Sequence, residues 1–159
     1  MNSIKEFPVN VYIEIEKYSN IKYEYNKKIR KLEIDRIIDS PYIYPYAYGF
    51  ITNTLALDND ELDALIITSK YLKNDTIYKT YIIGGLYMED EKGIDEKILC
   101  VLEEEYSNIK NINDLSPEIK KNISNFFDNY KKKTIDKWSK VGEFIDRDQA
   151  IDLYNKYKY

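Results

Sequence analysis

Residues 9–36 read VNVYIEIEKYSNIKYEYNKKIRKLEIDR, and apolar and polar side chains alternate along three segments of this stretch. The segments 9–15, 21–25 and 32–36 follow the two-residue period of a half-buried strand. A polar turn, Asn26-Lys27-Lys28, separates the second segment from the third. The stretch therefore predicts meandering antiparallel strands and a fold built mainly of β-structure.

More strands are expected further along the chain. Residues 64–68 and 80–88 are apolar and rich in β-branched side chains, as buried strands are. A short strand is expected at residues 138–141. Each of the two apolar runs lies beside an acidic cluster.

The last third of the chain changes to helix patterns. Ser116-Pro117-Glu118 combines an N-cap serine, a proline at the first helical position and an acidic first turn. Apolar residues then recur at helical spacing from Ile119 to Tyr130, and a final helix is predicted from about Asp146. Several short strands with two appended helices predict a single domain over residues 1–159, a small closed β-barrel flanked by helices.

Composition excludes several kinds of chemistry. The chain has no histidine, which rules out Ser-His and Cys-His triads and imidazole-bound metals. Its one cysteine, Cys100, allows neither an internal disulfide nor a cysteine-rich zinc site. A bound metal should therefore be a hard cation such as Mg²⁺, Mn²⁺ or Ca²⁺, held by oxygen atoms.

Charge and hydropathy restrict the partners. The formal net charge of -4 argues against nucleic acid as the main ligand, since that binding needs an excess of Lys and Arg. The N-terminus lacks an apolar signal region, and no run reaches the length of a membrane span. We therefore expect a cytoplasmic protein that binds neither nucleic acid nor membrane.

Two acidic clusters flank the apolar runs. Residues 58–63 precede the first run and residues 89–97 follow the second. Each cluster alone is typical of a solvated turn. Adjacent strands could nevertheless bring the two clusters face to face, which is how sites with several metal ions are assembled for phosphoryl transfer. The aspartates concerned are Asp58, Asp60, Asp63, Asp90 and Asp95.

Arg36 is the most informative cation. It shares a strand face with Leu32 and Ile34, so its guanidinium should point toward the core or a barrel mouth. An arginine in such a place needs an anion, either a carboxylate or a bound phosphate. The lysines and the tyrosine-rich segment 42–48 are, taken singly, typical of solvated charges and core packing.

The segment 44–63, YPYAYGFITNTLALDNDELD, resembles the signature of family I soluble inorganic pyrophosphatases. Further blocks resemble the family in the family order: residues 13–15, 21–24, 35–36, 88–97 and 126–131. The resemblance implies a mainly β fold with α, an OB-type five-stranded closed β-barrel flanked by two α-helices. It also implies hydrolysis of pyrophosphate to two phosphates by in-line attack of a metal-activated water, with no phosphoenzyme.

The resemblance further implies a role for each matching residue. Asp60 would be the general base, and Asp63 would bridge two metal ions. The metal ligands would be Asp58, Asp63, Asp90, Asp95 and Glu24. The phosphoryl groups would be bound by Lys22, Arg36, Tyr48, Lys97, Tyr130 and Lys131, with Glu14 and Tyr44 in support.

Cofactor and assembly follow from the same resemblance. Mg²⁺ would be the activating metal, with Mn²⁺ as a substitute and Ca²⁺ as an inhibitor, and the chain would form a homo-oligomer such as a hexamer. The sequence departs from the family pattern at Glu61, where a proline is common, and in its lack of histidine.

Three alternatives stay open at this point. A non-catalytic OB-fold domain could stack nucleic-acid bases on its tyrosines. A degenerate homologue or a calcium-binding module could keep the same fold without catalysis. The substrate could also be a nucleotide pyrophosphate.

Overall fold

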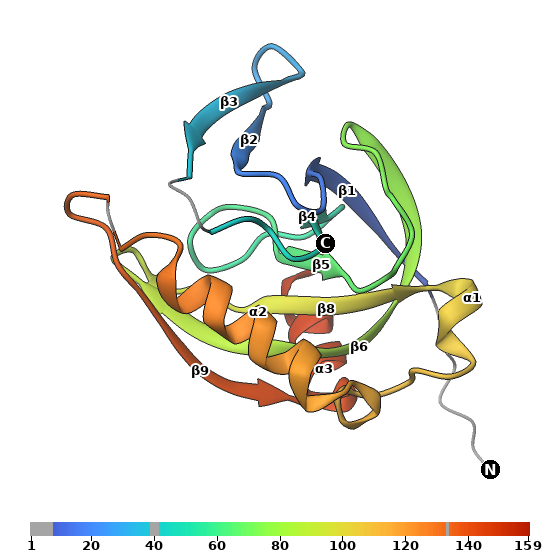
Figure 1. Cartoon of the computed structure of the whole chain (residues 1–159). Coiled ribbons are helices and arrows are strands. Elements are labelled where there is room, and N and C mark those ends of the chain that lie inside the picture. The colour runs from blue at the N-terminus through green and yellow to red at the C-terminus, as the bar shows by residue number, and fades with distance from the viewer. Residues whose placement is uncertain (1–7, 39–41, 133) are drawn as a thin grey trace.

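A ring of five strands forms the centre of the computed structural model, which describes residues 8–38, 42–132 and 134–159 (Figure 1). Each strand pairs with the next around the ring, and β1 pairs with both β4 and β6, so the ring is closed. The predicted five-stranded closed barrel is therefore confirmed. In spatial order the strands are β1 (Val9–Ile15), β4 (Ala47–Ile51), β5 (Asp63–Ile66), β8 (Lys97–Leu102) and β6 (Thr76–Asp90).

Strand β6 is the longest of the ring and also pairs outside it. Its second half pairs with β9 (Ser139–Ile145), and its end pairs with the short strand β7 (Gly93–Ile94). Strand β9 is longer than the short strand predicted at residues 138–141. All neighbours in this sheet are antiparallel except β5 and β8, which run parallel with Asp63 opposite Lys97.

The three N-terminal strands do not form the continuous meander that we predicted. Strands β2 (Ile21–Asn26) and β3 (Lys31–Ile37) pair with each other in a separate two-stranded sheet, which lies above the ring in Figure 1. Both strands are half-buried or exposed along their length. Alternation fits a hairpin as well as a ring strand, and the sequence could not reveal that β1 pairs with distant strands instead.

Strands β4 and β8 of the ring were not predicted from the sequence, and β8 shows why the apolar run at residues 98–102 is continuous. All six of its residues are buried. Leu99 and Val101 join a hydrophobic cluster that includes helix residues Phe126 and Phe127, whereas Cys100 and its even-numbered neighbours join a second cluster. A strand covered on both faces needs apolar side chains at every position.

Two helices cover the barrel, as predicted. Helix α2 (Pro117–Asn129) begins at Ser116, whose Oγ accepts a hydrogen bond from the N–H of Ile119 at 3.2 Å. Helix α3 (Arg147–Tyr157) begins at Asp146, whose carboxylate caps the N–H of Gln149 at 2.8 Å. Two short elements were not predicted from the sequence. They are the four-residue helix α1 (Glu103–Tyr106) and the 3-10 turn η1 (Ile112–Asp114).

The end of α3 supports the loop that leads into the first acidic cluster. The N–H of Leu55 donates to the carbonyl of Tyr157 at 2.9 Å, and the N–H of Tyr159 donates to the carbonyl of Asn53 at 3.0 Å. Thr54 and Lys158 form an isolated antiparallel bridge between these contacts. The loop before Asp58 is thus paired with residues about a hundred positions away.

No helix within residues 8–38, 42–132 and 134–159 is long and apolar enough to cross a membrane.

Gly49 in β4 gives a direct test of ring closure. A Cβ at this position would lie 1.7 Å from the carbonyl oxygen of Tyr12 in β1, so Gly49→Ala must push the two paired strands apart. We expect a loss of more than about 3 kcal/mol in the free energy of unfolding, measured by urea denaturation. Gly93→Ala is the control, because a Cβ there meets no atom within 4 Å. Its positive φ should cost roughly 1–2 kcal/mol, and equal losses for both variants would contradict the expectation.

Candidate active site

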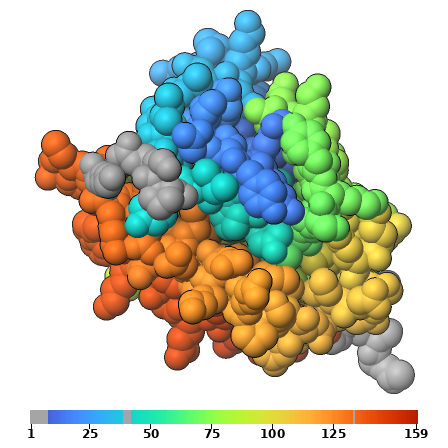
Figure 2. All heavy atoms as spheres, viewed as in Figure 1, coloured from blue at the N-terminus to red at the C-terminus, as the bar shows by residue number. Residues whose placement is uncertain are grey.

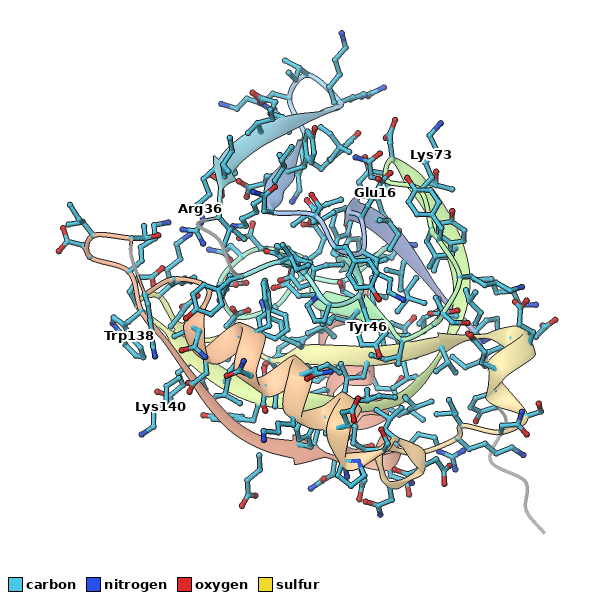
Figure 3. The ribbon with its side chains drawn as sticks, viewed as in Figure 1. Glu16, Arg36, Tyr46, Lys73, Trp138 and Lys140 are labelled. Carbon is cyan, nitrogen blue, oxygen red and sulfur yellow. The ribbon has the colours of Figure 1, made fainter. Side chains whose placement is uncertain are left out.

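A pocket of about 140 Å³ opens between the hairpin, the two acidic loops and the residues after α2. Figure 3 shows Arg36 in this region, where the hairpin faces the barrel. More carboxylates than lysines and arginines line the pocket. All the site residues predicted from the sequence line it: Glu14, Lys22, Glu24, Arg36, Tyr44, Tyr48, Asp58, Asp60, Asp63, Asp90, Asp95, Lys97, Tyr130 and Lys131.

The first acidic loop owes its shape to short-range hydrogen bonds. The carboxylate of Asp58 accepts from the N–H of Asp60 at 3.1 Å, which makes an Asx turn. Asn59 between them has a φ of 66°, a left-handed conformation that asparagine tolerates. At the far end, the N–H of Leu62 donates to Oγ1 of buried Thr54 at 2.9 Å. The loop is therefore fixed before any ligand binds.

Lys97 joins the carboxylates of both acidic loops. Its Nζ donates to Asp63 at 2.8 Å, to Asp95 at 2.9 Å and to the hydroxyl of Tyr48 at 2.7 Å. The lysine side chain is 2% exposed. Burial by itself would lower the pKa of Lys97, but the charges of Asp63 and Asp95 outweigh it and raise the pKa well above its usual value. The amine is therefore charged at neutral pH.

The second acidic loop is tied to the chain after α2. Nζ of buried Lys131 contacts the carboxylate of Asp90 at 3.1 Å and that of Glu91 at 3.5 Å. Glu91 also accepts from the N–H of Trp138 at 3.1 Å. The structure thus pairs Asp90 with Lys131, a contact that was not predicted from the sequence, with Glu91 as a second partner.

Arg36 and Tyr44 carry polar atoms without a hydrogen-bond partner. All three guanidinium nitrogens of Arg36 and the hydroxyl of Tyr44 are buried, and no residue within the described ranges bonds to them. The guanidinium lies 5.9 Å from the ring centre of Tyr130. Because a buried donor without an acceptor is costly, Arg36 is suited to receive an anion with several oxygen atoms.

Glu14 is a buried carboxyl on the barrel side of the pocket. Its Oε2 accepts from the N–H of Tyr25 at 2.9 Å. Burial raises the pKa of Glu14 to about 8, and the charges of Asp63 and Glu24 add to the rise. The hairpin residue Lys22 forms its ion pair with Asp35, at 3.0 Å.

The donor set fits a hard divalent cation in its chemistry. Burial, with Asp63 contributing, raises the pKa of Asp95, and burial together with the charge of Asp60 raises that of Asp58. A bound cation would relieve both effects. Within the residues that the structure describes, no three acidic side chains are grouped closely enough to hold a metal as they stand. The Lys97 amine instead joins Asp63 and Asp95.

Several residues that line the pocket were not predicted from the sequence. Glu91 could have been found from its place beside Asp90 in the second cluster. Glu61 stood out only as a departure from the family pattern, and nothing in the sequence pairs it with Lys27, yet Nζ of Lys27 lies 2.9 Å from its carboxylate. The other missed lining residues are Tyr23, Tyr25, Phe50, Lys92 and Lys137.

This barrel, with carboxylates and unpaired cationic donors at one mouth, has the features of a hydrolase for a small phosphorylated anion. Comparison with known proteins agrees with that class. The inorganic pyrophosphatase family matches residues 11–158. The inorganic pyrophosphatase of Gluconobacter oxydans is 41% identical over 152 residues, which cover 92% of this chain and 88% of that protein.

Other relatives give the same result. The inorganic pyrophosphatase of Campylobacter jejuni is 41% identical over 93% of this chain and 88% of its own. A solved structure of the Helicobacter pylori inorganic pyrophosphatase has a TM-score of 0.91 and 36% identity, covering 98% of this chain and 96% of that one. The chain therefore belongs to the inorganic pyrophosphatase family. The alternative of a non-catalytic nucleic-acid-binding domain gains no support from these comparisons.

Glu14 predicts a measurable pH effect. Its pKa in the folded protein, about 8, lies above the ordinary value of 4.5, so the folded state prefers the protonated form. Stability from this group is complete below about pH 4.5 and is lost as the pH rises toward 8. Glu14→Gln should remove that loss, because the amide does not titrate. The melting temperature of the variant minus that of the wild type should therefore increase as the pH rises from 5 to 8, in the presence of chelator.

The control for this experiment is Glu143→Gln, at an exposed glutamate outside the pocket. Its difference from wild type should stay constant with pH. A constant difference for Glu14→Gln as well would show that Glu14 titrates normally in the folded protein.

Proposed function

We propose that this protein hydrolyses inorganic pyrophosphate to two phosphate ions with divalent metal ions, of which Mg²⁺ is the activator. One observation carries the proposal. The guanidinium of Arg36, which has no hydrogen-bond partner among the described residues, lines the same pocket as Asp63 and Asp95, the carboxylates that Lys97 binds. A small, highly charged anion that arrives with metal cations would satisfy both groups.

The cationic residues of the pocket would bind the two phosphoryl groups. Arg36 offers three buried nitrogens, and the amines of Lys97 and Lys131 can exchange a carboxylate oxygen for a phosphate oxygen. Tyr48 supports Lys97 through its hydroxyl, and Tyr130 lies beside Arg36. Positive charge on the leaving phosphate lowers its basicity and so favours departure. Lys22 of the hairpin is the last of the residues proposed to bind the phosphoryl groups.

Asp60 would act as the general base. Its side chain is exposed on the pocket side of the first acidic loop, and its backbone is fixed by the Asx turn with Asp58. In this proposal its carboxylate orients a water molecule and accepts a proton as the water attacks phosphorus in line with the leaving group. The attack needs no covalent intermediate.

The metal ligands in this proposal are Asp58, Asp63 and Asp95, with Asp90 and Glu24 completing the set. Bound there, a divalent ion supplies Lewis acidity to the phosphoryl oxygens and lowers the pKa of a nearby water. Glu14 and Tyr44 support these groups from the barrel side. We expect Mn²⁺ to substitute for Mg²⁺ and Ca²⁺ to inhibit.

Assembly and location belong to the same proposal. We infer a homo-oligomer, such as a hexamer, and a cytoplasmic location, with pyrophosphate and phosphate as the ligands and no nucleic acid. These inferences rest on the family and on the acidic composition of the chain.

The decisive experiment measures phosphate release by purified protein. Pyrophosphate should be hydrolysed with Mg²⁺ present, and chelation of the metal should abolish release because the carboxylates then lack their cations. ATP tested in parallel checks whether nucleotide pyrophosphates are also substrates. No release from pyrophosphate with Mg²⁺ or Mn²⁺ would refute the proposal.

Replacing Asp60 separates catalysis from binding. We expect Asp60→Asn to lower kcat about a hundredfold or more, the usual effect of losing a general base, with little change in the binding of metal and substrate. Steady-state kinetics and calorimetric titration measure the two effects. Asp128→Asn, at an exposed site on α2, is the matched control and should behave as wild type. Unchanged turnover in Asp60→Asn would exclude Asp60 as the base.

Arg36 should contribute to affinity and not to stability. We expect Arg36→Gln to raise KM roughly tenfold to a hundredfold, since charged hydrogen bonds to phosphate are lost. Its free energy of unfolding should stay equal or rise, because no described residue depends on this guanidinium for a hydrogen bond. Arg30→Gln on the same hairpin is the control. Unfolding of Arg36→Gln with no defect in pyrophosphate affinity would instead indicate a structural role.

A further inference from the structure

The β2–β3 hairpin lies outside the barrel yet supplies part of the pocket. It forms a sheet of its own, and its residues make up the blue top of the molecule in Figure 2. Lys22, Glu24 and Arg36 line the pocket from this hairpin, while the acidic loops line it from the barrel. The two halves of the site therefore keep their geometry only if the hairpin keeps its position over the barrel.

The hairpin is held at three levels. At its base, the N–H of Tyr44 donates to the carbonyl of Ser19 at 2.9 Å. Close to the end of β2, the N–H of Tyr25 donates to Glu14 at 2.9 Å, and the ring centres of Tyr25 and Tyr12 lie 5.2 Å apart. At its tip, Nζ of Lys27 lies 2.9 Å from the carboxylate of Glu61 in the first acidic loop.

Both ends of the tip contact are held by local hydrogen bonds. The turn that carries Lys27 is fixed by the side chain of Asn26, which accepts from the N–H of Lys28 at 2.9 Å, and by the N–H of Arg30, which donates to the carbonyl of Asn26 at 2.7 Å. Glu61 lies between Asp60 and Leu62, and the latter is bonded to buried Thr54. The ion pair therefore couples the position of the hairpin strands to that of the first acidic loop.

The ion pair itself is partly in solvent. The side chain of Lys27 is 58% exposed and that of Glu61 is 21% exposed. An ion pair of this kind is weak and is screened by salt. It can open without unfolding the barrel, which would let the tip of the hairpin move away from the acidic loop.

We propose that Lys27 and Glu61 are positioning residues that latch the β2–β3 hairpin over the first acidic loop and so hold Lys22 and Arg36 at substrate distance. This inference rests on the proposed function of the pocket. The latch makes pyrophosphate affinity depend on an ion pair at the rim of the pocket that acts through the position of the hairpin, and it predicts that salt weakens affinity partly by releasing the hairpin.

Single neutralising variants distinguish a latch from a simple field effect. Loss of positive charge in Lys27→Met should weaken binding of an anion under either explanation. Loss of negative charge in Glu61→Gln should strengthen it if only the electrostatic field matters, because the pocket becomes more positive. The latch predicts the opposite: both variants should raise KM about twofold to fivefold, the range expected of a part-exposed ion pair, with kcat little changed.

Rescue and control variants complete the kinetic test. Lys27→Arg should retain the wild-type KM, and the charge swap Lys27→Glu with Glu61→Lys should restore most of the affinity lost in the single variants. Lys28→Met, one residue along the turn, is the matched control and should leave KM within the error of the wild type. A lower KM in Glu61→Gln, or no recovery in the charge swap, would overturn the latch.

Hydrogen exchange tests the latch independently of catalysis. The amide of Tyr25, whose hydrogen bond to Glu14 joins the hairpin to the barrel, should exchange faster in both single variants than in wild type, while the ring strand β8 keeps its protection. Unchanged exchange at Tyr25 would refute the latch even if KM moved. If the wild type failed to hydrolyse pyrophosphate, the proposed function would fall, and the exchange data would still decide whether the ion pair holds the hairpin.

Discussion

The structure depends on one buried amine, Nζ of Lys97. Strands β5 and β8 run parallel with Asp63 opposite Lys97, so both strands begin at the same edge of the ring and the loops that enter them meet there. Carboxylates from both loops would repel one another in this half-buried place without a cation between them. Lys97 supplies that cation. Its Nζ lies 5.1 Å from the ring centre of Tyr48 and 5.5 Å from that of Phe127. The amine of Lys97 is thus the point at which the hydrophobic core, helix α2 and the pocket meet.

Much of the barrel could be predicted from the sequence because its signals are local. The apolar runs at residues 64–68 and 80–88 marked the buried parts of β5 and β6, and Ser116-Pro117 and Asp146 marked the helix starts. That aspartates of both acidic clusters line one pocket could be predicted for a related reason. The acidic clusters lie directly beside buried strands, and a closed sheet brings the ends of neighbouring strands together. Arg36 stood out by its strand face, and resemblance to a family then added Lys22 of the hairpin and Lys131 after α2.

Other features depend on contacts that no local pattern records. Closure of the ring pairs Val9 with Thr80, so the sequence could not show that β1 leaves β2 and β3 to form a hairpin of their own. The ion pair of Lys27 with Glu61 joins a turn to a loop, and in sequence each residue is one charge among many. The double role of Lys97, as partner of two aspartates and as a pocket residue, depends on the parallel register of β5 and β8.

The backbone contacts between residues 53–55 and 157–159 set an order of events during synthesis. The loop before Asp58 gains the N–H of Tyr159 and the carbonyl of Tyr157 as partners only when that distant segment is present. On the ribosome, the ring strands β1, β4, β5, β6 and β8 leave the exit tunnel well before helix α3. The entry to the first acidic loop therefore lacks its C-terminal supports until residues 157–159 are free of the tunnel, and the pocket cannot take its final shape before then.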